Sequence, residues 1–232
     1  MLFDRVKDFT VKIMKHVRKR FRRKTAGRSA ALFLAYISLF LSALAISVVT
    51  CAQSSRLYLC VQEKCGLFEG EKPENRDDVV IMNESVVSFL SGRAQYIENA
   101  SERANLHMQD VKRIFDWTWK CGLALLVCAA LLIVKGRGAS GAVFMSLLPV
   151  FLALIVCALF VFSDFTKVFY RFHEIAFDND LWLLSPREDL LIRCLPEEFF
   201  YRMALIAAAR ALFMYFVFCL MAGLINKFGR RD

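Results

Sequence analysis

The sequence predicts an all-α integral membrane protein in which two extracytoplasmic loop regions cap a bundle of four transmembrane helices. Hydrophobic residues make up 57% of the 232 residues, above the roughly 45–50% typical of soluble domains. The mean hydropathy is +0.44. Four apolar segments approach the roughly 20 residues that a helix needs to cross a hydrocarbon core of about 30 Å. Basic and acidic connections alternate between these segments, as expected when the chain crosses the membrane repeatedly.

The four expected spans differ in how cleanly they are delimited. They are Ser29–Cys51, Cys121–Val134, Gly138–Ser163 and Met203–Asn226. The first and third contain no charged residue. The second is short, but Trp117 and Trp119 extend it outward, and the Lys120 side chain can reach the interface. The fourth contains one charge, Arg210, which is costly inside a membrane unless it meets a polar or anionic partner.

Basic residues orient the chain. Residues 1–28 contain eleven Lys or Arg against two Asp. The link after the second span carries Lys135 and Arg137, and the C-terminal tail, 227–232, is also basic. Lys and Arg favour the cytoplasmic side, so we expect the basic N-terminus and the tail inside, joined by a transmembrane domain, 29–226. Such a basic run could also bind nucleic acid, but no nucleic-acid motif accompanies it. Anionic membrane lipid is therefore the expected partner.

The two remaining connections are acidic and are expected outside. Residues 52–116 contain eight basic and eleven acidic side chains, and residues 164–198 contain four and eight. The larger insertion has short β-branched runs that allow a few short strands before a helical pattern begins at Val86. Cys60 and Cys65 lie in this insertion, where an oxidising compartment would permit a disulfide. No metal-ligand array is visible in the sequence.

Two of the three histidines fall on the outer side. His107 precedes the second span and His173 follows the third, so neighbouring spans can bring them together. Asp110 lies three residues after His107 and shares its helix face. A carboxylate beside an imidazole can orient it, and histidine titrates near the pH at which general bases work best. The two histidines are therefore the expected catalytic residues, although a lone histidine on an apolar helix face is more often structural.

The motifs around these histidines resemble a known family. The segments HMQDVKRIF and FHEIAFDNDLWLLSPREDLLIRCLPEEFF, together with the four-span layout, are similar to the bacterial lipoprotein intramolecular transacylase (Lit) family. The likeness runs from about Ser29 to the end of the fourth span. It is most specific in the two histidine motifs and in the Leu-Pro-x-x-Phe-Phe element at Leu195–Phe200.

The resemblance implies a membrane acyltransferase of the bacterial cytoplasmic membrane with its active site on the outer side. Its substrate would be a lipoprotein whose N-terminal Cys carries a diacylglyceryl group and a free α-amine. The sn-2 acyl chain would move to that amine without a cofactor, giving a lyso-form lipoprotein. His107 and His173 match the histidines that the family is thought to use. The supporting or substrate-binding candidates are Asp110, Arg171, Asn179, Trp182, Arg202 and Arg210.

Two other classes of protein remain open from the residues alone. A four-helix thiol oxidoreductase would use Cys60 and Cys65, although four intervening residues are not the familiar two-residue redox spacing. A non-enzymatic membrane assembly or signalling protein would use the outer region as a docking surface. The sequence leaves the oligomeric state open.

Overall fold

Every regular element that the structure describes is a helix. The computed structural model describes residues 2–136 and 142–228, with side chains described for Lys15, 25–136 and 144–225. The elements are α1 (Leu2–Ala52), α2 (Ser55–Lys64), α3 (Arg76–Leu90), α4 (Glu102–Lys135), α5 (Ala142–Val161), α6 (Phe165–Ala176), α7 (Leu190–Cys194) and α8 (Glu197–Phe228). The all-α prediction is confirmed over this part of the chain.

Four of these helices are long and apolar enough to cross a membrane, as predicted. The corresponding segments are Thr25–Ala52, Glu102–Lys135, Phe144–Val161 and Glu197–Ile225. Each overlaps an expected span, and the second and fourth begin well before the apolar runs do. The expected start of the third span at Gly138 and the basic residues Arg137, Arg230 and Arg231 lie outside the described residues.

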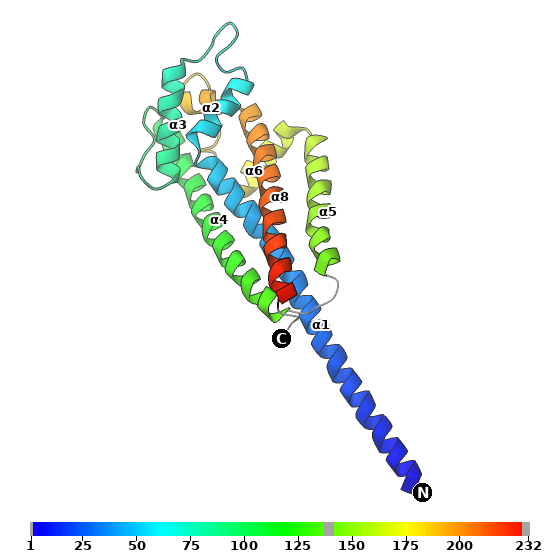
Figure 1. Ribbon diagram of the computed structural model, residues 1–232. Coiled ribbons are helices and arrows are strands. Elements are labelled where there is room, and N and C mark those ends of the chain that lie inside the picture. The colour runs from blue at the N-terminus through cyan, green and yellow to red at the C-terminus, as the bar shows by residue number, and fades with distance from the viewer. Residues whose placement is uncertain (1, 137–141, 229–232) are drawn as a thin grey trace.

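Helix α1 is the centre of the bundle and contacts α4, α5 and α8 (Figure 1). The α1–α4 contact is close because Gly122 has no side chain: a Cβ there would lie only 2.9 Å from the Cβ of Ala45. The Ser42 hydroxyl donates to the Gly122 carbonyl over 2.8 Å. On the other side, the Ser47 hydroxyl donates to the Ala207 carbonyl of α8, also over 2.8 Å. Small residues and interhelical hydrogen bonds are typical of packing between membrane helices.

The first part of α1 extends beyond the bundle as a continuation of the same helix (Figure 1). The 51 residues of α1 correspond to about 76 Å at 1.5 Å per residue. This length exceeds twice the roughly 30 Å core of a bilayer. The basic segment 1–28 thus continues into the first span without a helix break after Leu2. The side chain of His16, expected to be solvated, lies outside the described residues.

The expectation of short strands between the first two spans is wrong, because helices α2 and α3 occupy these segments. The buried residues of α3 include Val79, Met82, Asn83 and Val86, which recur at intervals of three and four. That spacing places them on one face of a helix. The local enrichment in β-branched residues suggested strands, but burial of a helical face determines the structure.

A second apolar core lies outside the membrane bundle, at the end where α2, α3 and α7 gather (Figure 1). Two buried amides link its elements. Gln62 Nε2 donates to Asn83 Oδ1 over 2.9 Å, and Asn83 Nδ2 donates back to Gln62 Oε1 over 2.6 Å. Gln62 Nε2 also donates to the Cys194 carbonyl over 2.8 Å. Because unpaired buried amides are costly, these three bonds fix how α2, α3 and α7 pack together.

The cysteines of the outer region do not form a reactive pair in this structure. Cys60 and Cys65 are both free thiols. Cys60 lies within α2 and Cys65 is its C-cap, and five residues along a helix separate two side chains by about 140° around the axis. Burial is the main cause that raises the pKa of the Cys65 thiol, and burial likewise raises the pKa of Cys194 to about 12. Such thiols hold little of the reactive thiolate.

Candidate active site

The two histidine-bearing helices are positioned by caps at their N-termini. Helix α4 is capped by Ser101, whose hydroxyl oxygen accepts from the Ala104 N–H over 3.1 Å. The same hydroxyl donates to the Asp189 carboxylate, which also accepts the Leu191 N–H at the start of α7. Helix α6 follows α5 after a short turn, and its N-cap is Asp164. These caps fix where each helix begins and hence how high His107 and His173 lie above the bundle.

The structure brings His107 and His173 together. Their ring centroids are 6.0 Å apart, with the ring planes inclined by 38°. Both are buried, with 7% and 9% of their surface exposed. The two rings thus lie side by side, as the placement of His107 before the second span and of His173 after the third allows. Residues 66 positions apart in the sequence therefore form one dyad.

His173 is held in a single tautomer. Its Nδ1 atom lies 2.7 Å from the Phe169 carbonyl oxygen, one helical turn earlier. Because a carbonyl oxygen can only accept, Nδ1 carries the proton and Nε2 keeps a free lone pair. Burial lowers the pKa of His173, and the bond to Phe169 offsets part of this effect. A neutral imidazole with a free Nε2 is the form that a general base requires.

His107 presents a buried ring nitrogen without a protein partner. Among the described residues, its Nδ1 atom makes no hydrogen bond, although it is shielded from solvent. The Phe177 ring packs edge-on against His107, with centroids 4.9 Å apart. An unpaired buried polar atom costs free energy unless something else satisfies it. A substrate polar group is one such partner.

Aromatic rings form the walls around the dyad. Phe169 lies 4.2 Å, Trp182 5.0 Å, Phe172 5.4 Å and Phe177 5.6 Å from His173, measured between ring centroids. Trp182 was expected near the site from the sequence, whereas Phe169 and Phe177 were not. The four-residue spacing between Phe169 and His173 on one helix was the signal that could have identified Phe169. These rings surround the dyad with apolar surface, which suits an acyl chain.

Asp110 does not orient His107 as expected. Among the described residues, no hydrogen bond joins the two. Instead, Asp110 Oδ2 accepts from Asn179 Nδ2 over 3.0 Å, and Oδ1 lies 3.5 Å from Arg113. Arg103, another residue of α4, donates to the Asp180 carbonyl. Together these contacts form a clasp, defined as Asp110–Asn179 and Arg103–Asp180, that holds the loop after α6 against α4. Of the clasp residues, sequence reasoning missed Arg103.

Among the described residues, none of the three arginine candidates is hydrogen-bonded to an imidazole. The Arg171 guanidinium is exposed and donates to Glu174 over 2.9 Å. Arg202 Nε lies 2.7 Å from a Glu198 oxygen, as an ion pair without an aligned hydrogen bond. Arg210 donates to the Cys51 sulfur over 3.0 Å.

The depth of Arg210 follows from the helix register. Because Gly122 packs against Ala45 in antiparallel α4 and α1, Cys51 lies at about the level of residue 116. His107 is nine residues further outward, or about 14 Å at 1.5 Å per residue. The Arg210 guanidinium, beside Cys51, is therefore too deep to stabilise an oxyanion at the dyad.

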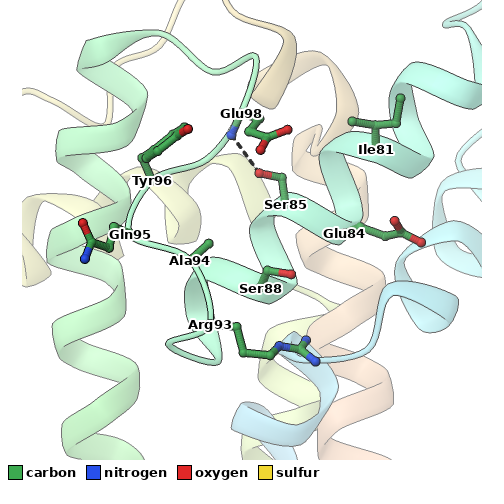
Figure 2. A pocket seen from close by; sticks show the side chains of 9 residues that line it. All are labelled: Ile81, Glu84, Ser85, Ser88, Arg93, Ala94, Gln95, Tyr96 and Glu98. Carbon is green, nitrogen blue, oxygen red and sulfur yellow. Dashed lines mark hydrogen bonds between the residues drawn. The ribbon is translucent and has the colours of Figure 1, made fainter.

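A cavity of about 500 Å³ lies on the outer region but not at the histidines (Figure 2). Residues of α3 and the following loop line it, among them Ser85, Ser88, Arg93 and Tyr96. In Figure 2 the Ser85 hydroxyl oxygen accepts from the Glu98 N–H, a contact of 2.7 Å. None of its lining residues touches either imidazole, so the chemistry of the dyad, not the size of this cavity, identifies the active-site candidate.

No group of three or more His, Cys, Asp or Glu within the described ranges is arranged to hold a metal ion. The site itself offers a neutral imidazole with a free nitrogen, a second imidazole with an unpaired nitrogen, and aromatic walls beside a membrane bundle. Such a site can move a proton between two heteroatoms of a lipid-like substrate.

Comparison with known proteins gives a family match. The family model described as lipoprotein intramolecular transacylase Lit matches residues 33–200. An uncharacterised protein of Aquifex aeolicus (strain VF5) is 29% identical over 159 residues, covering 64% of this chain and 68% of that protein.

Solved structures give the same fold. The membrane-integral lipoprotein intramolecular transacylase Lit from Bacillus cereus superposes with a TM-score of 0.69 at 19% identity, covering 88% of this chain and 97% of that one. A variant of that protein with one histidine replaced by arginine superposes with a TM-score of 0.67 at 18% identity, covering 93% and 97%.

Proposed function

Because this chain belongs to the lipoprotein intramolecular transacylase (Lit) family, we propose that it moves the sn-2 acyl chain of a diacylglyceryl-Cys lipoprotein to that lipoprotein's own α-amine. Membership makes it a bacterial membrane enzyme of the acyltransferase type. The product is a lyso-form lipoprotein with an N-acyl group and one remaining ester. The observation that carries the proposal is the buried pair of imidazoles, 6.0 Å apart, at the outer end of the bundle.

The reaction needs only movement of a proton. The α-amine nitrogen attacks the ester carbonyl carbon, a C–N bond forms, and the C–O bond to glycerol breaks. One proton leaves nitrogen and one reaches the glycerol oxygen, so the atoms balance without a co-reactant. The α-amine has a pKa of about 7.7–8.0 and is partly deprotonated at neutral pH. Donor and acceptor belong to one molecule, so holding them in place supplies much of the rate.

The two histidines take different roles in this proposal. His173 Nε2 removes the proton from the attacking amine, because the Phe169 carbonyl fixes the proton on Nδ1. His107 hydrogen-bonds the reacting ester through its otherwise unpaired Nδ1 and assists delivery of the proton to the departing glycerol oxygen. The aromatic walls exclude water, which would otherwise hydrolyse the ester.

The depth of the dyad fits this substrate. His107 lies 28 residues before Lys135, the last residue of α4, or about 42 Å along the helix axis. A bilayer is about 30 Å thick in its hydrocarbon core and about 40–45 Å with its headgroups. If Lys135 lies in the inner headgroup layer, the dyad lies in the outer one, where glycerol esters are found. The proposed topology accordingly places both chain ends in the cytoplasm and the active site outside.

The reaction is tested with purified protein in proteoliposomes and a synthetic diacylglyceryl lipopeptide. Intramolecular transfer leaves the mass unchanged, so fragment-ion spectra must locate the acyl chain on nitrogen. Two substrates are mixed, one deuterated in both its peptide and its acyl chains and the other unlabelled. Every product should combine the peptide and the acyl chain of the same substrate molecule. A lipopeptide with an acetylated α-amine is the matched control and should stay unchanged. Crossed products would show an intermolecular reaction, and recovery of intact substrate would refute acyl transfer.

A further inference from the structure

Helix α6 has an apolar face that is largely exposed in the part of the chain that the structure describes. Val168, Phe172 and Ile175 lie on one side of the helix at intervals of four and three. Ile175 is 84% exposed and Phe172 is 55% exposed. Single exposed apolar side chains are normal on a protein surface, but a contiguous row of them marks a contact with another phase or molecule.

The charged residues of α6 occupy a different side of the helix. Lys167, Arg171 and Glu174 share an arc whose centre lies about 100° around the helix axis from that of the apolar row, given 100° per residue. The Lys167 and Arg171 side chains are 82% and 79% exposed, and Arg171 pairs with Glu174 on the same arc. Strong separation of a charged face from an apolar face is typical of a helix that lies in the plane of a membrane surface.

The third side of α6 faces the protein and carries the catalytic imidazole. His173 and Phe169 lie one helical turn apart on this side, and Phe169 packs on Phe200 of α8 with ring centroids 5.4 Å apart. The helix therefore presents three separate surfaces: one to the bundle, one to water and one that is apolar and open.

The connection to α5 fixes the level of α6. The third candidate span ends at Val161, and α6 begins only four residues later, at Phe165. Phe162 in this turn is 89% exposed, and most of the α5 surface is exposed and apolar. The open face of α6 thus continues the lipid-facing surface of α5 at its outer end. Tyr170 and Trp182 pack together nearby, with centroids 5.5 Å apart, and such residues favour the membrane interface.

We infer that α6 lies in the plane of the outer membrane surface, with Val168, Phe172 and Ile175 among lipid acyl chains, and that the acyl chain of the substrate passes from this face around the Phe172 edge of the helix to His173 on the adjoining side. The lipid contact rests on the exposed apolar row of α6, whereas the entry route rests on the proposed function. Immersion of α6 holds the catalytic nitrogen at the depth of the glycerol esters. The substrate then needs only to move sideways in its leaflet, with no extraction into water.

The inference is tested by photo-crosslinking the full chain in phosphatidylglycerol proteoliposomes whose lipids carry an alkyne-tagged acyl chain. p-Benzoylphenylalanine replaces Phe172 or Ile175 on the apolar face, and Lys167 or Glu174 on the charged face as matched controls. Lipid adducts are expected at Phe172 and Ile175 and should be absent at Lys167 and Glu174. Equal lipid labelling on both faces, adducts between two copies of the protein, or no adduct at Phe172 and Ile175 would each overturn the inference. This readout needs no enzymatic activity, so it is independent of the proposed reaction.

The entry route is tested kinetically with Ile175→Glu, and Glu174→Gln serves as its neighbour control. A charge on the apolar face should raise the KM for a substrate presented in the bilayer and leave kcat unchanged, because His173 itself is intact. Glu174→Gln should change neither constant. A fall in kcat at unchanged KM for Ile175→Glu would contradict an entry role even if the lipid adducts form as expected.

Discussion

Breaking the clasp between α4 and the loop after α6 should slow the reaction without unfolding the protein. Asn179→Leu removes the donor that bonds to Asp110 Oδ2 over 3.0 Å. A hydrogen bond to a charged group contributes about 1.5–3 kcal/mol. The Asp110 side chain keeps 22% exposure and an ion pair with Arg113, so water can replace part of the lost bond and the lower figure applies. If the clasp positions His173 against His107, a loss of about 1.5 kcal/mol lowers the rate about tenfold.

The assay is conversion of the diacylglyceryl lipopeptide in proteoliposomes, followed by fragment-ion mass spectrometry. Exchanging the two groups in Asp110→Asn with Asn179→Asp restores a charged hydrogen bond and should recover most of the rate. Asp110→Asn alone leaves a neutral hydrogen bond, and its rate should lie between those of Asn179→Leu and the exchange variant. A wild-type rate for Asn179→Leu would refute the positioning role. Failure of the exchange variant to recover would show that the carboxylate has another function at its own position.

Three other perturbations separate packing, thiol and proton-transfer effects. Gly122→Leu should lower Tm and reduce the folded yield, because a Cβ there already lies 2.9 Å from the Ala45 Cβ and overpacking costs about 1–3 kcal/mol; an unchanged Tm would show that α1 and α4 can separate freely. Cys60→Ser with Cys65→Ser should leave the conversion rate unchanged; loss of conversion at normal yield would revive a thiol mechanism. Burial lowers the pKa of His173, so the neutral base and its contribution to stability should begin to be lost only as pH falls below the ordinary value of about 6.5 and through the lowered pKa; direct titration of the His173 imidazole by NMR with a midpoint above 6.5 would contradict this.

The sequence was sufficient to predict the bundle because the membrane imposes a simple requirement on apolar length. Each expected span was found, including the short one at Cys121–Val134, whose helix extends outward to Glu102. The outer helices were harder to predict. Val79 and Val86 are β-branched residues of the kind that is common in strands. They belong to a helix because one face of α3 is buried against α2 and α7.

The two reactive histidines could be predicted from the sequence. The residues that position them were much harder to predict. The sequence places His107 and His173 on the same side of the membrane, each next to a span. The fold brings the two rings together. Proximity in sequence wrongly suggested that Asp110 orients His107, whereas its partner Asn179 is 69 positions away. Arg210 was one of the supporting candidates, but its guanidinium bonds to Cys51 well below the dyad. Such pairings depend on helix register, which composition does not encode.

Fragment-ion mass spectrometry of a lipopeptide treated with His107→Ala or His173→Ala protein tests the central claim most directly. Each substitution should lower formation of the N-acyl lyso product by 10²–10⁴-fold, the usual contribution of a general acid or base. The double variant should lose little more than either single variant if the two imidazoles act as one unit. Membrane insertion and Tm, measured on the same samples, separate loss of chemistry from loss of fold. Wild-type product yield from correctly inserted His173→Ala protein would contradict the dyad mechanism.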